Sequence, residues 1–177
     1  FCGHPMKTTK KIAYLSIFVA LAMILSFIES QIPTFIPVPG IKLGLPNIAI
    51  IFLLYRFGWK EATIVNLARI LLVSWLFGSA YSLLYSLTGG ILSLLVMIIL
   101  KKLNWFSCIT VSVIGGVFHN IGQIITACIV TSTKEIIGYL PALLISGTIA
   151  GIVIGLIGAQ LIKRFQNSDN DNDECSE

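Results

Sequence analysis

The sequence predicts an all-α membrane protein, a bundle of six transmembrane helices with both termini on the cytoplasmic side. Its composition, the spacing of its apolar runs and the distribution of its basic residues each point there. Of 177 residues, 56% are hydrophobic and 11% are charged, with a mean hydropathy of +0.92. Soluble domains carry about 25% charged residues, so an ordinary soluble fold is excluded. We expect a multi-pass protein of the cell membrane with no nucleic-acid partner.

Six apolar segments approach the length of a membrane span. A spanning helix takes about 20 residues, because the hydrocarbon core is about 30 Å thick and each residue rises about 1.5 Å. The predicted spans are residues 11–29, 43–57, 61–77, 81–100, 107–130 and 136–162. They form one domain, residues 11–165, after a tail of residues 1–10 in which Met6 is the expected native start. Residues 166–177 are polar and acidic and are predicted to be disordered.

Basic residues set the predicted orientation. Nine lie on the side of the N-terminus: Lys7, Lys10, Lys11, Arg56, Lys60, Lys101, Lys102, Lys163 and Arg164. The opposite loops hold Lys42 and Lys134. Because cytoplasmic loops are rich in Lys and Arg, both termini are predicted to be cytoplasmic. The four cysteines show no paired spacing, so we expect reduced thiols.

Residues 32–46 cannot form a continuous helix. The segment holds four prolines and two glycines and is apolar apart from Lys42. Irregular backbone is not tolerated against lipid, so the segment must rest on protein or line a cavity. It is either an outer loop that caps the bundle or a lid over a binding pocket, and the two interpretations are compatible.

The second span is short, and Pro46 and Asn47 suit its first turn. If the helix begins below the outer surface, its N-terminal N–H groups point into the bundle and attract an anion. Alternatively, residues 43–45 extend the helix outward.

Arg69 lies near the middle of the third span, with Asn66 one turn away on the same face. An arginine at a helix centre costs about 3 kcal/mol on insertion scales, so it should face a partner or a cavity. Glu29, near the outer end of the first span, is the candidate acid. Arg69 is therefore either half of a structural pair with Glu29 or a substrate-binding residue.

Three polar residues of the fifth span, His119, Asn120 and Gln123, fall within one and a half turns. His119 and Gln123 share a face with Gly115, whereas Asn120 points toward an adjacent helix. A helix-packing network and a ligand site both explain them. No second histidine lies in a span, so we expect no metal site.

Small residues form two stripes. Gly147, Gly151 and Gly155 recur at every fourth position of the last span, and Ser16 and Ala20 repeat that spacing in the first. Such stripes allow close helix approach, either within the chain or to a partner subunit.

The chain also resembles a known family. The motifs that carry the resemblance are SFIES from Ser26, PVPGIKLG from Pro37, FGWKEA from Phe57, NLAR from Asn66, FGS from Phe77 and GGVFHNIGQ from Gly115. Together they resemble the small membrane family labelled Gx transporter, or heptaprenyl diphosphate synthase component I, over about residues 11–162.

That family is similar to the substrate-binding S components of energy-coupling factor transporters. The resemblance implies a pocket in the outer half closed by the loop between the first two helices. It also implies docking through small residues, here Ser16 and Ala20, onto a transmembrane coupling protein with ATPase subunits. Some relatives are implied to serve flavin-based extracellular electron transfer.

The prenyl synthase label has no chemical support in the sequence. Elongation on a diphosphate needs clustered carboxylates to hold Mg²⁺, whereas Glu29, Glu61 and Glu135 are scattered among segments. We expect neither enzymatic activity nor a cofactor.

Two functions remain. In the first, the protein is a substrate-binding transporter subunit for a small anionic or polar solute. Its predicted pocket residues are Arg69, Asn66, His119, Asn120, Gln123, Asn47, Lys42 and Glu29. In the second, it is a structural or quinone-handling subunit of a redox membrane complex.

Overall fold

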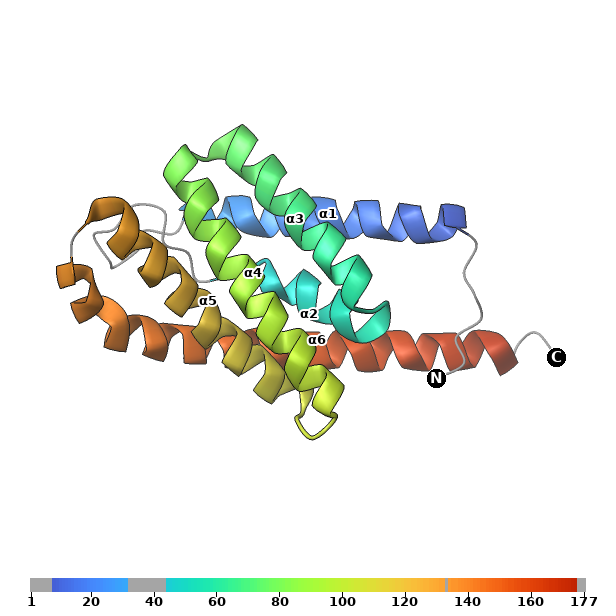
Figure 1. The fold of residues 1–177 in the computed structure, drawn as a ribbon. Helices are drawn as coiled ribbons and strands as arrows, with labels where there is room; N and C mark the ends of the chain where they lie inside the picture. The colour runs from blue at the N-terminus through green and yellow to red at the C-terminus, as the bar shows by residue number, and fades with distance from the viewer. Residues whose placement is uncertain (1–7, 32–43, 133, 175–177) are drawn as a thin grey trace.

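The computed structural model describes residues 8–31, 44–132 and 134–174, which form six α-helices and one short 3-10 helix (Figure 1). The elements are α1 (Thr8–Gln31), α2 (Asn47–Arg56), α3 (Trp59–Phe77), α4 (Ala80–Leu103), α5 (Cys108–Thr131), η1 (Lys134–Tyr139) and α6 (Leu140–Glu174). No strand occurs in these ranges. The predicted all-helical fold class is confirmed, whereas most of the proposed lid, with Lys42, lies outside the described residues.

Four helical segments are long and apolar enough to cross a membrane, namely Thr9–Gln31, Ala80–Leu103, Cys108–Thr131 and Glu135–Phe165. The ten residues of α2 reach only about 15 Å, half of a hydrocarbon core. The 19 residues of α3 are long enough but carry three charged residues, Lys60, Glu61 and Arg69. The chain is thus a membrane-type helical protein in which α2 and α3 are the atypical segments.

The helices are arranged around α2. Figure 1 shows α1 and α6 running in opposite directions on either side of α2, with α3, α4 and α5 slanting across them. The start of α1 and the end of α6 lie at the same end of the molecule (Figure 1). α5 packs most extensively against α4 and α6, and α2 contacts α1, α3 and α6.

Local sequence sets the helix ends. Ser79 and Ser107 cap α4 and α5, their hydroxyls each accepting a hydrogen bond of 3.2 Å from the backbone N–H three residues on. Asn104 ends α4 in the left-handed region, a conformation that asparagine tolerates better than most residues. These devices explain boundaries within a few residues of those predicted from hydropathy.

In the structure α6 continues as a helix to Glu174, into the acidic tail of residues 166–177. Once a helix has nucleated, each further residue adds one backbone hydrogen bond without a new nucleation step. The disorder of the tail stays a prediction.

The hydrophobic core consists of two clusters of buried residues. We define the inner cluster as Ile50, Ile51, Leu53, Leu54, Ala62, Val65, Leu94, Met97, Val111 and Ile154. The outer cluster is Tyr85, Ile124, Ala127, Ile136 and Leu143. Within the described residues, α2 through α6 supply the inner cluster and α1 packs against it, whereas α4, α5, η1 and α6 supply the outer cluster. Along α4 and along α5, buried polar residues lie between the residues of the inner cluster and those of the outer cluster.

The glycine stripe of α6 packs against α5. A Cβ on Gly147 would lie 3.0 Å from the carbonyl oxygen of Gly116, and one on Gly151 would lie 2.6 Å from the Cα of Val113. A Cβ on Gly155 would lie 2.8 Å from the Cα of Ile109. Of the two uses that the sequence left open for this stripe, the structure shows packing within the chain.

Candidate functional site

A set of buried polar side chains lies in the middle of the bundle, and we call it the polar layer. Its members are Glu29, Asn47, Asn66, Arg69, His119, Asn120 and Gln123, none more than 6% exposed. They come from α1, α2, α3 and α5, so distant parts of the chain converge on it. All seven belong to the predicted pocket residues. The eighth, Lys42, lies outside the described residues.

Asn66 holds the guanidinium group of Arg69. Its Oδ1 accepts hydrogen bonds from Nε at 3.1 Å and from Nη2 at 2.9 Å. Its Nδ2 in turn donates to the carbonyl oxygen of Gly90 at 3.2 Å, which ties α3 to α4. Because Asn66 is three residues before Arg69 on one helix, the pair is built locally. The asparagine therefore fixes the direction in which the arginine points.

Glu29 links α1 to the turn that precedes α2. Its carboxylate accepts hydrogen bonds from the backbone N–H groups of Gly44 and, at 3.3 Å, Leu45. Gly44 lies at φ +92°, a left-handed conformation that glycine adopts without strain. The carboxylate also interacts electrostatically with the charge of Arg69. Glu29 thus serves two groups, the turn before α2 and the buried arginine.

These contacts decide how α2 begins. The helix starts at Asn47, with Leu45 and Pro46 in a turn, so the interpretation that residues 43–45 extend the helix outward is wrong at 44 and 45. The cause is Glu29, which holds the Gly44–Leu45 turn inside the protein. Asn47 is consequently buried. An anion at this helix N-terminus stays a prediction, and the carboxylate of Glu29 lies at the turn that precedes the helix.

The three polar residues of α5 contact different neighbours. His119 and Gln123 contact each other at 3.2 Å through their side-chain nitrogens. A Cβ on Gly44 would lie 3.6 Å from Cδ2 of His119, and one on Gly89 would lie 3.2 Å from Cε1. The His119 side chain of α5 therefore lies beside the turn before α2 and beside α4.

Asn120 faces α6 instead. Its Nδ2 donates to the carbonyl oxygen of Leu143 at 2.6 Å. The contact with an adjacent helix that its position predicts is therefore present, and it ties α5 to α6.

The sequence also contained a signal that we did not use. α4 presents a face of small residues at helical spacing, and all of them are buried: Ser82, Ser86, Gly89, Gly90 and Ser93. Gly89 and Gly90 let α4 approach both Asn66 and His119, since side chains there would clash with their neighbours. A search for small residues at every third or fourth position would have found this face.

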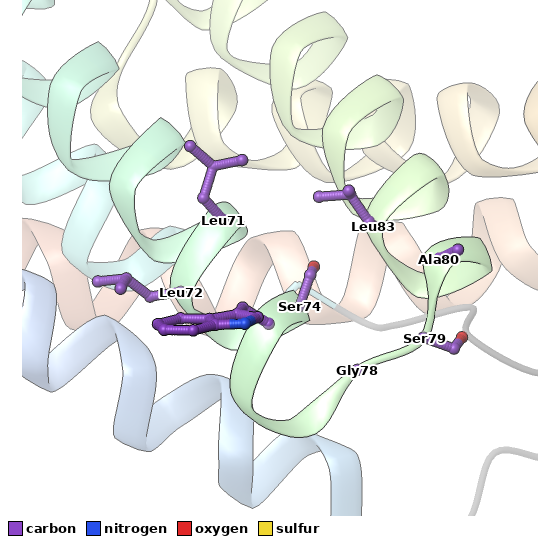
Figure 2. Close-up of a pocket in the computed structure, with 8 residues that line it drawn as sticks. Leu71, Leu72, Ser74, Gly78, Ser79, Ala80 and Leu83 are labelled. Carbon is purple, nitrogen blue, oxygen red and sulfur yellow. The ribbon is translucent and has the colours of Figure 1, made fainter.

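A cavity of about 490 Å³ lies elsewhere, between the end of α3 and the start of α4 (Figure 2). Its lining is Leu71, Leu72, Ser74, Trp75, Gly78, Ser79, Ala80 and Leu83, without any member of the polar layer. In the ranges that the structure describes, no group of three His, Cys, Asp or Glu side chains could hold a metal ion.

Comparisons with known proteins give one match. No curated protein and no solved structure is significantly similar to the chain. The sequence model of one family, heptaprenyl diphosphate synthase component I, matches residues 18–161, and this range contains the whole polar layer. The chain therefore belongs to the heptaprenyl diphosphate synthase component I family.

Proposed function

We propose that this protein is a six-span membrane subunit that binds a small anionic or polar solute, with Arg69 as the residue that receives its negative charge. The observation that carries the proposal is the setting of that guanidinium group. Arg69 is 5% exposed, and Asn66 occupies the Nε and Nη2 edge. Within residues 8–31, 44–132 and 134–174, Asn66 accepts the hydrogen bonds that Arg69 donates, and Glu29 acts on it through its charge. The Nη1 edge is therefore suited to a carboxylate or phosphate oxygen.

The two charges of the polar layer balance, and an anion is favoured because the acid of this layer is already shared with other groups. Its charged groups are Glu29 and Arg69, and the same Glu29 carboxylate accepts hydrogen bonds from two backbone N–H groups. A solute carboxylate beside Arg69 would replace part of the interaction with Glu29. Asn47, His119 and Gln123 supply further polar atoms around that position.

Access is proposed from the side opposite the termini. The excess of basic residues predicts cytoplasmic termini, and the start of α1 and the end of α6 lie at one end of the bundle (Figure 1). The Gly44–Leu45 turn, which Glu29 holds, directly follows residues 32–43. The solute is proposed to enter beside this turn, and Lys42, which lies outside the described residues, is proposed as an additional positive charge.

The positions of Glu29 and Glu61 fit a binding protein better than they fit a prenyl transferase. Glu61 forms an ion pair with Lys11, and Glu29 holds the turn before α2, so these two carboxylates already have partners in different places. Energy for transport would come from a partner. Ser16 and Ala20 are exposed on α1 and offer a face for a transmembrane coupling protein with ATPase subunits.

The test is identification of co-purifying molecules, with Arg69→Lys as the variant. Lysine keeps the positive charge opposite Glu29 but loses the planar, two-pronged geometry. We expect the wild-type protein in mild detergent to carry a small anionic solute, and the variant to bind it roughly tenfold to a hundredfold more weakly. Mass spectrometry of the purified samples and titration with the identified solute measure this.

Arg164→Lys is the matched control, because Arg164 is exposed near the end of the α6 span. Equal affinity in the wild type and Arg69→Lys would contradict the assignment of Arg69. Recovery of a quinone or flavin would instead support the redox-complex function. Lipid alone in every sample would contradict a solute site.

A further inference from the structure

Five exposed basic residues lie near the ends of four helices, and we call them the basic end: Lys10, Lys60, Lys102, Lys163 and Arg164. They belong to α1, α3, α4 and α6. Within residues 8–31, 44–132 and 134–174, none of the five forms an ion pair. The basic end therefore carries positive charge that the described part of the protein does not neutralise.

Contacts around the end of α2 bring these helix ends together. The Nζ of Lys101 donates a hydrogen bond to the carbonyl oxygen of Leu54, so α4 ends beside the end of α2. The ion pair between Lys11 and Glu61 joins the start of α1 to the start of α3. Since α3 follows α2 after a short turn, three of the four helix ends meet around the end of α2.

The sixth helix brings its basic residues to the same place. The ring centroids of Phe165 and Phe52 are 5.2 Å apart, so Lys163 and Arg164 directly precede a residue that packs against α2. The acids of α6 begin at Asp169, five residues after Arg164, which is about 8 Å further along a continuing helix. The backbone of α6 therefore carries its acidic residues past the basic end.

The basic end coincides with the ends of candidate membrane spans. Three of these spans begin or end within two residues of a member of the basic end: Thr9–Gln31, Ala80–Leu103 and Glu135–Phe165. Trp59 and Trp105, which are 51% and 87% exposed, lie at the start of α3 and in the connection that follows α4. Basic residues and tryptophan at the ends of apolar helices are typical of the level of the lipid headgroups.

We propose that the basic end binds the headgroups of anionic phospholipids and prefers them to zwitterionic ones. Phosphodiester oxygens supply the negative charge that the described protein does not provide there, and Lys and Arg bind them through charge-assisted hydrogen bonds. The Nζ of Lys60 lies 5.6 Å from the ring centre of Trp59, so a charge and an interfacial ring form one unit.

The layout of the charges favours lipid over an acidic protein segment. The five residues come from four helix ends instead of one groove or one helix face, and this arrangement suits a plane of headgroups. The basic end lies at the end of α2, whereas Asn47 of the polar layer lies at its start. The lipid site is therefore independent of the proposed solute site.

Quenching of tryptophan fluorescence by brominated lipids tests the proposal. With Trp75 changed to phenylalanine, the tryptophans that remain are Trp59 and Trp105. The full chain is reconstituted in phosphatidylcholine vesicles, into which brominated phosphatidylglycerol or brominated phosphatidylcholine is mixed. We expect the phosphatidylglycerol to bind about threefold to tenfold more tightly at low salt. The preference should fall toward one at about 1 M salt, where charges are screened within about 3 Å.

Lys60→Gln combined with Lys102→Gln should remove most of this preference. Lys60→Arg combined with Lys102→Arg is the matched control, because it changes the same exposed positions but keeps their charge. Neither pair should change the thermal unfolding midpoint in detergent by more than a few degrees, since both side chains are exposed.

Equal binding of the two lipids would overturn the proposal, as would a preference that persists at high salt or in the glutamine variant. Loss of the preference in the arginine variant would overturn it too, because the charge is kept there. A preference that appears only after the acids of residues 166–177 are changed to amides would show that the acidic tail occupies the basic end instead.

Discussion

A leucine at position 151 is expected to prevent the folded protein from accumulating. The first side-chain carbon alone would lie 2.6 Å from the Cα of Val113 and 3.0 Å from the carbonyl oxygen of Ser112. Both contacts are with backbone, so α5 and α6 would have to separate along their shared face. Overpacking typically costs about 1–3 kcal/mol, and here the backbone must move, so we expect a loss above that range. Yield of monodisperse protein and the thermal unfolding midpoint in detergent measure the effect.

Gly138→Leu is the matched control for this substitution. Nothing lies within 4 Å of a Cβ built on Gly138, so the same change should be tolerated there. Normal folding of Gly151→Leu, together with loss of a partner protein, would show that the stripe is an interface between subunits. That result would contradict the packing described above.

Glu29→Gln is expected to destabilise the protein by about 1–3 kcal/mol, because the buried carboxylate accepts hydrogen bonds from the N–H groups of Gly44 and Leu45 and its charge interacts with that of Arg69. Glu29→Gln, Arg69→Met and the double variant form the cycle that tests the coupling. Each single change leaves a buried charge without its counterpart, whereas the double variant removes both. We therefore expect the double variant to be more stable than the sum of the single changes predicts. Unfolding free energies in one detergent provide the comparison.

Glu61→Gln is the control for charge removal as such. The ion pair between Lys11 and Glu61 is partly exposed, with 41% and 12% of the side chains accessible, so its loss should cost no more than about 1 kcal/mol. Additive effects of the Glu29 and Arg69 substitutions, within about 0.5 kcal/mol, would show that the two residues act independently.

Much of this fold could be predicted from the sequence, because apolar run lengths report helices directly. Burial of the polar layer could be predicted too, since Arg69 and His119 lie in the middle of apolar segments. The contacts of these residues could not be predicted. Periodicity places Asn120 on a face of α5 but does not say that α6 lies across from that face. Likewise, the spacing of Gly151 indicates close approach without naming the partner.

The start of α2 shows a different limit. Pro46 and Asn47 are compatible with a helix start at either depth, so local sequence could not decide between the alternatives. The decision comes from Glu29, fifteen residues before Gly44, whose carboxylate accepts a hydrogen bond from the N–H group of that glycine. Similarly, the cavity between the end of α3 and the start of α4 depends on how these two helices pack, which composition does not encode.

The division of the core has a consequence for motion. Among the described residues, the outer cluster contains none from α1, α2 or α3. At that end of the bundle, α3 is joined to α4 by Gly78 and Ser79 and, further along the two helices, by the hydrogen bond between Asn66 and the carbonyl oxygen of Gly90. At the other end, α2 through α6 share one apolar cluster against which α1 packs. We therefore expect the half of the bundle that contains the outer cluster to open locally more readily than the half in which five helices share the inner cluster.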